Sequence, residues 1–257
     1  MDKKQVYFVG AGPGAADLIT VRGMNLIAQS DVVIYAGSLV NPDLLSYAKA
    51  DAKIYNSAYM TLEEVLDVMK DAAASGLTVC RLHTGDPSIY GAVREQMDAL
   101  DELGISYESC PGVSAAFGAA AAMDLEYTLP GISQSLIITR MAGRTGVPEK
   151  ESIESWAAHR ATMAIYLSAG MLGELTDRLI SGGYSAGTPA AIVYKATWPD
   201  EEFYYCRLED LAETARAHGI TKTALVLVGD VIGKSGYEKS KLYDKTFTTE
   251  FRRGSEE

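Results

Sequence analysis

The chain has few of the side chains that bind metals or form disulfides. Its 257 residues include three cysteines and three histidines, and neither set is clustered or placed at metal-ligand spacing. The cysteines, Cys80, Cys110 and Cys206, also form no disulfide framework, which suggests the reducing environment of the cytoplasm. We therefore expect no metal site and a cytoplasmic protein.

Long apolar runs and an excess of positive charge are missing as well. No run approaches the roughly 20 residues that cross a bilayer, so we expect no membrane partner. A predicted strand begins at Val6, which leaves no room for a signal peptide. The net charge of −11 argues against a nucleic-acid partner, because phosphate binding needs a basic face. The chain also lacks a Gly-x-Ser-x-Gly elbow and a P-loop lysine motif, which argues against those catalytic classes.

The sequence does contain a regular alternation of strands and helices. Five β-prone runs separated by helical patterns predict an open, parallel, doubly wound sheet within residues 1–120. A second α/β domain, residues 121–238, has a hairpin-like pairing from Phe203 onward, which predicts a mixed sheet. Residues 239–257 are expected to form a C-terminal tail. The predicted fold class is therefore α/β, with two α/β domains.

The first predicted helix, from about Thr20 to Gln29, carries an apolar stripe. Val21, Met24, Ile27 and Ala28 recur at the spacing of one helical face. We expect these four side chains to be buried against the sheet.

Three predicted strands of the first domain end in bends rich in glycine and proline: Gly10–Gly14, Thr84–Pro87 and Cys110–Ser114. Ligands of open parallel sheets bind outside the carboxyl ends of the strands, so we expect these bends to converge on one crevice. Ordinary turns between strand and helix remain the alternative. His83 precedes the second bend, where a hydrogen-bonded strand-end histidine is the expected role.

The first bend also satisfies the G-x-G-x-x-A pattern of dinucleotide-binding loops. Two features weigh against a nicotinamide cofactor. Pro13 removes an N–H from a loop that would donate such groups to a pyrophosphate. The second strand ends in Ala36-Gly37-Ser38 and offers no acid for the ribose hydroxyl. Dinucleotide binding is therefore the weaker alternative.

Together, these motifs resemble those of the S-adenosylmethionine-dependent tetrapyrrole (corrin/porphyrin) methyltransferases. The similar stretches are Gly10–Gly14 with Asp17–Thr20, Thr84–Gly91, Pro111–Ala115, Tyr35–Val40, Ile138–Arg140 with Gly143–Thr145, and Tyr194–Pro199. The last three narrow the resemblance to a branch that acts on a corrin precursor. The likeness runs from about Val6 to Gly233. It implies a homodimer of two-domain subunits, with S-adenosyl-L-methionine as cosubstrate, and S-adenosyl-L-homocysteine as product, in a trough between the domains.

The resemblance also assigns a donor site, residue by residue. The matching positions are Pro13, Thr84, Gly85, Asp86, Ile89, Tyr90, Ser114 and Ala115 in the first domain, and Leu167, Ala196 and Ala224 in the second. Asp86 is expected to pair with a positive or hydroxyl group of the donor. Simple capping of the turn is the alternative for this carboxylate.

The acceptor implied by the resemblance is a tetrapyrrole fringed with carboxylates. A net charge of −11 repels such a ligand unless local basic groups override the field. Arg140 and Arg144 flank a glycine-containing loop and Lys195 follows a strand end, so we expect these three to bind the acceptor. Solvated loop arginines remain the alternative. Tyr90 and Trp198 are candidates to stack on the macrocycle, and core packing is the alternative expected for at least one of them.

No general base is assigned, because methyl transfer depends mainly on alignment of the reacting atoms. Three functions stay open at this point. They are methylation of the corrin precursor, methylation at another position of a related ring, and binding of a tetrapyrrole or nucleotide without catalysis.

Overall fold

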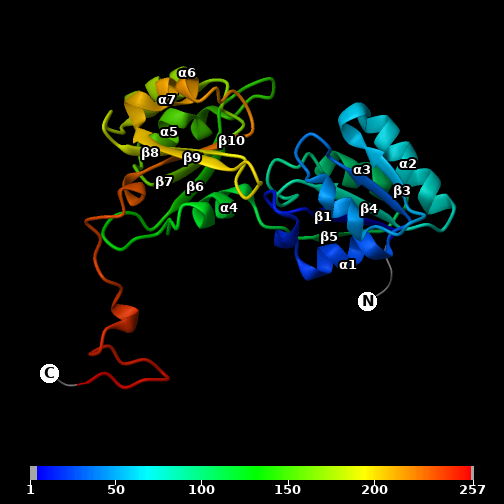
Figure 1. The fold of residues 1–257 in the computed structure, drawn as a ribbon, viewed down its shortest axis with the longest axis horizontal. Coiled ribbons are helices and arrows are strands. Elements are labelled where there is room, and N and C mark those ends of the chain that lie inside the picture. The colour runs from blue at the N-terminus through cyan, green and yellow to red at the C-terminus, as the bar shows by residue number, and fades with distance from the viewer. Residues whose placement is uncertain (1–4, 256–257) are drawn as a thin grey trace. The chain divides into compact units, whose positions relative to one another are not determined.

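The computed structural model describes residues 5–255, and these divide into two compact α/β units (Figure 1). The first unit holds the residues up to Ala122 together with the short segment Lys195–Glu202. The second unit holds Met123–Tyr194 and the residues from Phe203 onward. The predicted α/β class with two sheets is confirmed.

The first unit is built on a five-stranded sheet with the order β3-β2-β4-β1-β5. Its strands are β1 Val6–Gly10, β2 Val32–Tyr35, β3 Lys53–Asn56, β4 Val79–His83 and β5 Tyr107–Cys110. Every neighbouring pair is parallel, so all five carboxyl ends lie at one edge. The predicted parallel, open sheet is therefore confirmed.

Helices cover both faces of this sheet. They are α1 Val21–Gln29, α2 Leu62–Ala74 and α3 Arg94–Glu102, with 3-10 turns at Ala16–Leu18, Pro42–Tyr47 and Ser57–Tyr59. A further helix, α4 Ala115–Ala122, follows β5. Phe8 packs in one core cluster with Met69 of α2, while its neighbour Val9 packs in another with Ile27 of α1. This alternation follows from the two-residue period of a strand and makes the sheet doubly wound.

The predicted stripe of α1 is only partly correct. Ile27 is buried, but Val21 is 72% exposed and Ala28 is also exposed. The buried face is centred on Gly23, where an added Cβ would lie 3.1 Å from a Val9 methyl carbon. The absence of a side chain at Gly23 lets the helix approach the sheet there, which turns Val21 outward.

The second unit contains a mixed sheet with the order β6-β7-β10-β8-β9. Its strands are β6 Leu136–Arg140, β7 Thr162–Tyr166, β8 Pro189–Tyr194, β9 Glu202–Arg207 and β10 Ala224–Val228. β6 runs parallel to β7, whereas β10 is antiparallel to both β7 and β8. Its helices are α5 Ile153–Ala157, α6 Leu172–Gly182 and α7 Leu211–Ala217, and its 3-10 turns are Glu149–Glu151, Leu208–Asp210, Asp230–Gly233 and Lys241–Tyr243.

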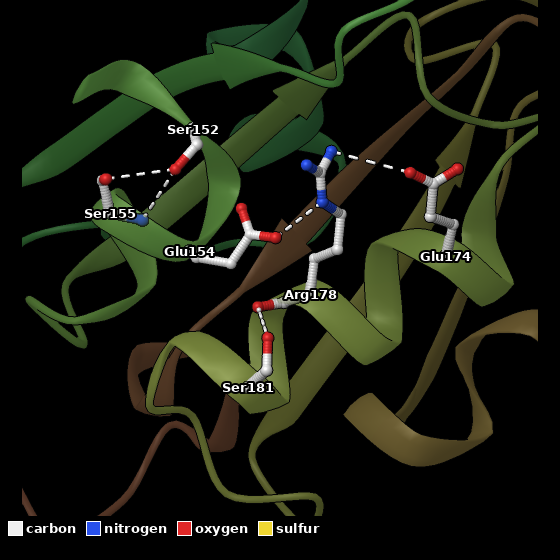
Figure 2. A network of polar contacts seen from close by, with 6 residues as sticks. All are labelled: Ser152, Glu154, Ser155, Glu174, Arg178 and Ser181. Atoms are coloured by element: carbon white, nitrogen blue, oxygen red, sulfur yellow. Dashed lines mark hydrogen bonds and ion pairs between the residues drawn. The ribbon is translucent and has the colours of Figure 1, made fainter. Parts of the chain in front are cut away.

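A polar network joins α5 to α6 (Figure 2). Arg178 Nε donates to Glu154 Oε1 at 2.7 Å, and its Nη1 lies 3.6 Å from Glu174 Oε1. Burial alone would raise the pKa of the Glu154 carboxyl, but hydrogen bonds from its own backbone and from Arg178 hold the pKa below its usual value. The helices touch at Gly182, where an added Cβ would lie 2.7 Å from the Glu154 Cα.

Candidate functional site

The first two glycine-bearing bends of the first unit are joined through their backbones. Gly12 N–H donates to the Gly85 carbonyl at 3.2 Å, and Gly85 N–H donates to the Gly12 carbonyl at 2.8 Å. Ala11 N–H adds a bond to the His83 carbonyl at 2.7 Å. The parallel register of β1 and β4, which pairs Gly10 with His83, brings the two bends to the same height.

The third bend closes on the other two through Gly112. A Cβ added there would lie 2.2 Å from the Gly85 carbonyl oxygen and 2.7 Å from the Gly10 Cα. Gly112 N–H donates to Asp86 Oδ2 at 2.9 Å. The predicted convergence of the three bends is confirmed. Glycine is required at Gly10 and Gly112 because backbone meets backbone there, and at Gly85 because φ is +60°. We call Gly10, Gly85 and Gly112 the glycine junction.

Asp86 is fully engaged in holding this arrangement. Its Oδ1 accepts the backbone N–H of Ser88 at 2.8 Å as well as the Ser88 hydroxyl, and its Oδ2 accepts Gly112 N–H. Burial raises the pKa of this carboxyl, but these hydrogen bonds outweigh burial and the pKa lies below its usual value. The turn-capping alternative describes these contacts, and direct contact with a donor stays a prediction.

The small-residue helix α4 begins directly after the third bend. The Ser114 carbonyl accepts N–H groups from Phe117 and Gly118, which starts the helix. A Cβ added to Gly118 would lie 2.8 Å from two carbons of the buried Pro13 ring. The run of alanine and glycine thus lets α4 lie close to the first bend.

Residues Lys195–Glu202 return to the first unit and hold the same bend. Thr197 Oγ1 accepts the Ala15 N–H at 3.0 Å, and Trp198 Nε1 donates to the Pro13 carbonyl at 3.2 Å. The Trp198 ring lies against Gly14, where a Cβ would be 2.3 Å from its Cδ1. Trp198 therefore supports the bend by packing, which is the alternative to stacking on a macrocycle.

Sequence reasoning missed two of these supports. Asn41 caps the following turn, because its Oδ1 accepts the Asp43 N–H, and its Nδ2 also donates to the Gly14 carbonyl at 2.9 Å. Thr197 adopts a φ of +69°, a region rarely used by a β-branched residue. The only signal for Thr197 was its place in the stretch Tyr194–Pro199, because strain of this kind has no local sequence pattern.

Several predicted site residues share this left-handed backbone. Tyr90, Leu167 and Lys195 have φ values of +55°, +53° and +45°. Such conformations cost energy and gather at functional sites, where surrounding structure maintains them. Their coincidence with residues predicted from motifs favours a functional role for these positions.

The predicted donor residues fall into two groups. Pro13, Gly85, Asp86, Ser114 and Ala115 lie at the glycine junction or beside it, and Thr84, Ile89 and Tyr90 continue the second bend. Ala196 belongs to the same unit, and its carbonyl faces Gly14. Leu167 and Ala224 belong to the second unit. β7 and β10 are antiparallel and pair Val226 with Ile165. Leu167, just after β7, and Ala224, at the start of β10, therefore lie at the same end of these two strands.

The basic residues predicted for the acceptor differ in their surroundings. Arg140 donates to the carbonyls of Met141, Thr145 and Gly146 at 2.9–3.1 Å, so its guanidinium holds the loop that follows β6. Arg144, on that loop, is exposed. Lys195 Nζ contacts Asp200 Oδ2 and lies 5.8 Å from the Trp198 ring centroid.

None of the helices within residues 5–255 is long and apolar enough to cross a bilayer. Over the same range, no group of three or more His, Cys, Asp or Glu side chains is arranged to hold a metal ion.

Comparison with known proteins adds a family match over most of the chain. Residues 5–212 match the family described as Tetrapyrrole (Corrin/Porphyrin) Methylases. The cobalt-precorrin-4 C(11)-methyltransferase of Methanocaldococcus jannaschii is 52% identical over 98% of this chain and 97% of its own length.

Two solved structures are also similar. The X-ray structure of a cobalamin biosynthetic enzyme, cobalt precorrin-4 methyltransferase, has a TM-score of 0.86 at 44% identity and covers 88% of this chain and 95% of its own. The uroporphyrin-III C-methyl transferase of Thermus thermophilus complexed with S-adenyl homocysteine has a TM-score of 0.74 at 26% identity. It covers 90% of this chain and 100% of its own.

Proposed function

The chain belongs to the tetrapyrrole (corrin/porphyrin) methylases, and from this premise we propose that it methylates carbon 11 of cobalt-precorrin-4 or precorrin-4 in cobalamin biosynthesis, with S-adenosyl-L-methionine as donor. The observation that carries the proposal is the near-complete alignment with a relative of that name at 52% identity. The confirmed glycine junction supports it, because the motifs of the resemblance meet in space.

The donor fits the chemistry of the first bend better than a dinucleotide does. S-adenosyl-L-methionine presents a sulfonium that supplies an electrophilic methyl group, and it has no pyrophosphate that would need the N–H missing at Pro13. A related enzyme was solved with S-adenyl homocysteine. We assign donor contacts to the backbone around Gly85 and Ala115, with Asp86 positioning the bends through Gly112 and Ser88. Ala196, in the first unit, supplies apolar surface for the adenine, and the same role for Leu167 and Ala224 of the second unit rests on the resemblance.

The acceptor carboxylates need local positive charge in a chain of net charge −11. Arg144 is exposed on the loop after β6, and Arg140 gives that loop its shape. We assign direct contact to Arg144 and Lys195, and a positioning role to Arg140. Exposed guanidinium groups can pair with carboxylates through two parallel hydrogen bonds.

The reaction is an in-line displacement. The ring carbon forms a bond to the methyl group with its own electron pair, while the carbon–sulfur bond breaks and its pair stays on sulfur. S-adenosyl-L-homocysteine leaves as a neutral thioether. Holding the three reacting atoms in line is the main contribution of the protein, so no side chain is required as a strong base.

We also propose that the protein is a cytoplasmic homodimer, as its resemblance implies. Cys80, Cys110 and Cys206 are all free thiols, which suits a reducing compartment. Light scattering on the purified chain measures the oligomeric state. A monomer over the working concentration range would contradict the dimer.

The central test is direct turnover. The protein is incubated with labelled S-adenosyl-L-methionine and precorrin-4, in cobalt-loaded and metal-free form, and NMR locates the new methyl group. Label at carbon 11 supports the proposal, and the better substrate identifies the natural form. Label at another ring position would contradict the proposal and indicate a related methyltransferase that modifies that position. Tight binding without transfer would favour a non-catalytic tetrapyrrole-binding module.

Arg144 provides a variant test of the acceptor site. Arg144→Ala should raise the acceptor KM roughly tenfold, since a charged hydrogen bond is lost, and should leave donor affinity unchanged. Arg216→Ala, at an exposed position on α7, is the matched control. Equal KM values for the two variants would contradict an acceptor contact and leave Arg144 as a solvated loop arginine.

A further inference from the structure

The first unit contains a cavity of about 290 Å³ at the carboxyl ends of β2 and β4. Its walls come from these strand ends, the beginning of α2, the second bend and the beginning of α3. Its polar lining includes Arg81, His83, Thr84, Ser57 and Gln96, with Tyr90 just after the second bend. A volume near 290 Å³ lies at the small end of the range for ligand pockets, so the cavity suits a side arm or a small molecule and not a macrocycle.

Arg81 brings a buried positive charge to this cavity without an anion to match it. The side chain is 7% exposed; Nε donates to Gln96 Oε1 at 3.2 Å and Nη1 donates to the Ile34 carbonyl at 3.3 Å. Both acceptors are neutral, and no ion pair within residues 5–255 includes Arg81. Burial lowers the pKa of the guanidinium to about 10, so the group is still charged at neutral pH. A charged group in this position gains most from a carboxylate ligand.

His83 supplies a second polar group that lacks a partner. It stands two residues beyond Arg81 on β4 and therefore on the same face of the sheet. It is 5% exposed, and its Nε2 is buried with no hydrogen-bond partner among the described residues. The expected role as a hydrogen-bonded strand-end histidine is therefore wrong for this atom. Burial and the nearby Arg81 charge lower the pKa of His83 to about 3, so the ring is neutral. In its Nε2–H tautomer, it carries a buried donor that lacks an acceptor, in a residue that lines the cavity.

We propose that this cavity is a subsite for one carboxylate arm of the acceptor, bound by Arg81 and His83. The inference rests on the proposed methyl transfer to a tetrapyrrole. The cavity is lined by Thr84 of the second bend and by Ile89 and Tyr90 just after it, so a bound arm would anchor the ring beside that bend. Glu95 is the one carboxylate on the wall, and its exposed position leaves it solvated. Such a subsite helps to explain how an acidic protein holds an anionic substrate.

The test compares kinetic constants for variants that differ at one donor. Arg81→Met should raise the acceptor KM roughly 10- to 100-fold, and Arg81→Lys should recover part of the loss because the charge remains. His83→Phe keeps a ring beside Phe8 and should raise KM roughly fivefold. Donor affinity, measured by calorimetry, should stay within twofold. Arg94→Met is the matched control, because Arg94 is exposed on α3 and pairs with Asp98 away from the cavity.

A small dicarboxylate gives an independent readout. Succinate should inhibit the wild-type protein competitively against the acceptor, and Arg81→Met should lose this inhibition. Unchanged acceptor KM in both Arg81→Met and His83→Phe would overturn the subsite. A fall in donor affinity with a normal acceptor KM would also overturn it, because the cavity would then hold the carboxylate of the donor.

Folding and function are separated by two further measurements. Circular dichroism identifies a variant that fails to fold. If Arg81→Met does not fold, the acceptor KM of His83→Phe and the inhibition of the wild type by succinate decide whether the subsite exists. A wild-type protein that binds the tetrapyrrole without methylating it would overturn the proposed function. In that case the dissociation constants of the same variants for the tetrapyrrole still decide the subsite.

Discussion

Replacing Gly112 by alanine tests whether the three bends must touch. The new methyl carbon would lie 2.2 Å from the Gly85 carbonyl oxygen, 2.7 Å from the Gly10 Cα and 2.9 Å from the Gly10 carbonyl carbon. All three are backbone atoms, and Gly85 is also tied to Gly12 by two hydrogen bonds. No side chain can rotate to make room, so a bend must move.

The expected loss follows from two contributions. Overpacking a tight site costs about 1–3 kcal/mol. Displacing the bend also weakens the hydrogen bond from Gly112 N–H to the Asp86 carboxylate, a charged bond worth about 1.5–3 kcal/mol when intact. With partial relaxation, we expect the free energy of unfolding to fall by about 2–4 kcal/mol, which corresponds to a lower Tm on the order of 10 °C.

The matched control is Gly104→Ala. Gly104 has a φ of +66° and no atom within 4 Å of an added Cβ, so its cost is conformational only, about 1 kcal/mol. Urea unfolding followed by circular dichroism measures both losses, and calorimetry measures affinity for S-adenosyl-L-methionine. We expect Gly112→Ala to lose at least twice the stability of the control and most of its donor affinity. Equal stability losses with normal donor binding would refute the glycine junction as the element that shapes the site.

Three further predictions concern other contacts. Because hydrogen bonds depress the folded-state pKa of Asp86, its stabilisation is present above the unfolded-state pKa, about 4, and is lost as pH falls through the folded value. Asp86→Asn should therefore reduce the free energy of unfolding at pH 7 and have little effect near pH 2; an equal loss at both values would contradict this. Gly182→Ala places a methyl 2.7 Å from the backbone of α5 and should lower the free energy of unfolding, measured in urea, by about 1–3 kcal/mol. The control Gly173→Ala, in open space on the same helix, should raise it by up to about 1 kcal/mol. Trp198→Phe removes the hydrogen bond to the Pro13 carbonyl and should lower the free energy of unfolding by about 0.5–1.5 kcal/mol and weaken donor binding. An unchanged dissociation constant for S-adenosyl-L-methionine would show that Trp198 does not support the donor site.

The sequence was informative wherever a pattern is local. Thr61 and Glu64 form the capping box that starts α2, as their spacing indicates. The three bends were recognisable because glycine and proline interrupt β-prone runs, and their convergence follows from a parallel sheet whose carboxyl ends share one edge. The apolar stripe of α1 was less reliable, since the close approach at Gly23 and not hydrophobicity sets its buried face.

The sequence by itself determined the order of strands and helices, the parallel and mixed sheets, and the positions of the glycine-bearing bends, because periodicity and turn chemistry act between near neighbours. Only the tertiary structure decided that Trp198 holds Pro13, that Arg140 binds its own loop, and that Arg81 and His83 share a cavity without an anion. These outcomes depend on which distant backbones come within hydrogen-bonding distance. Packing decides that distance, and no local pattern records it.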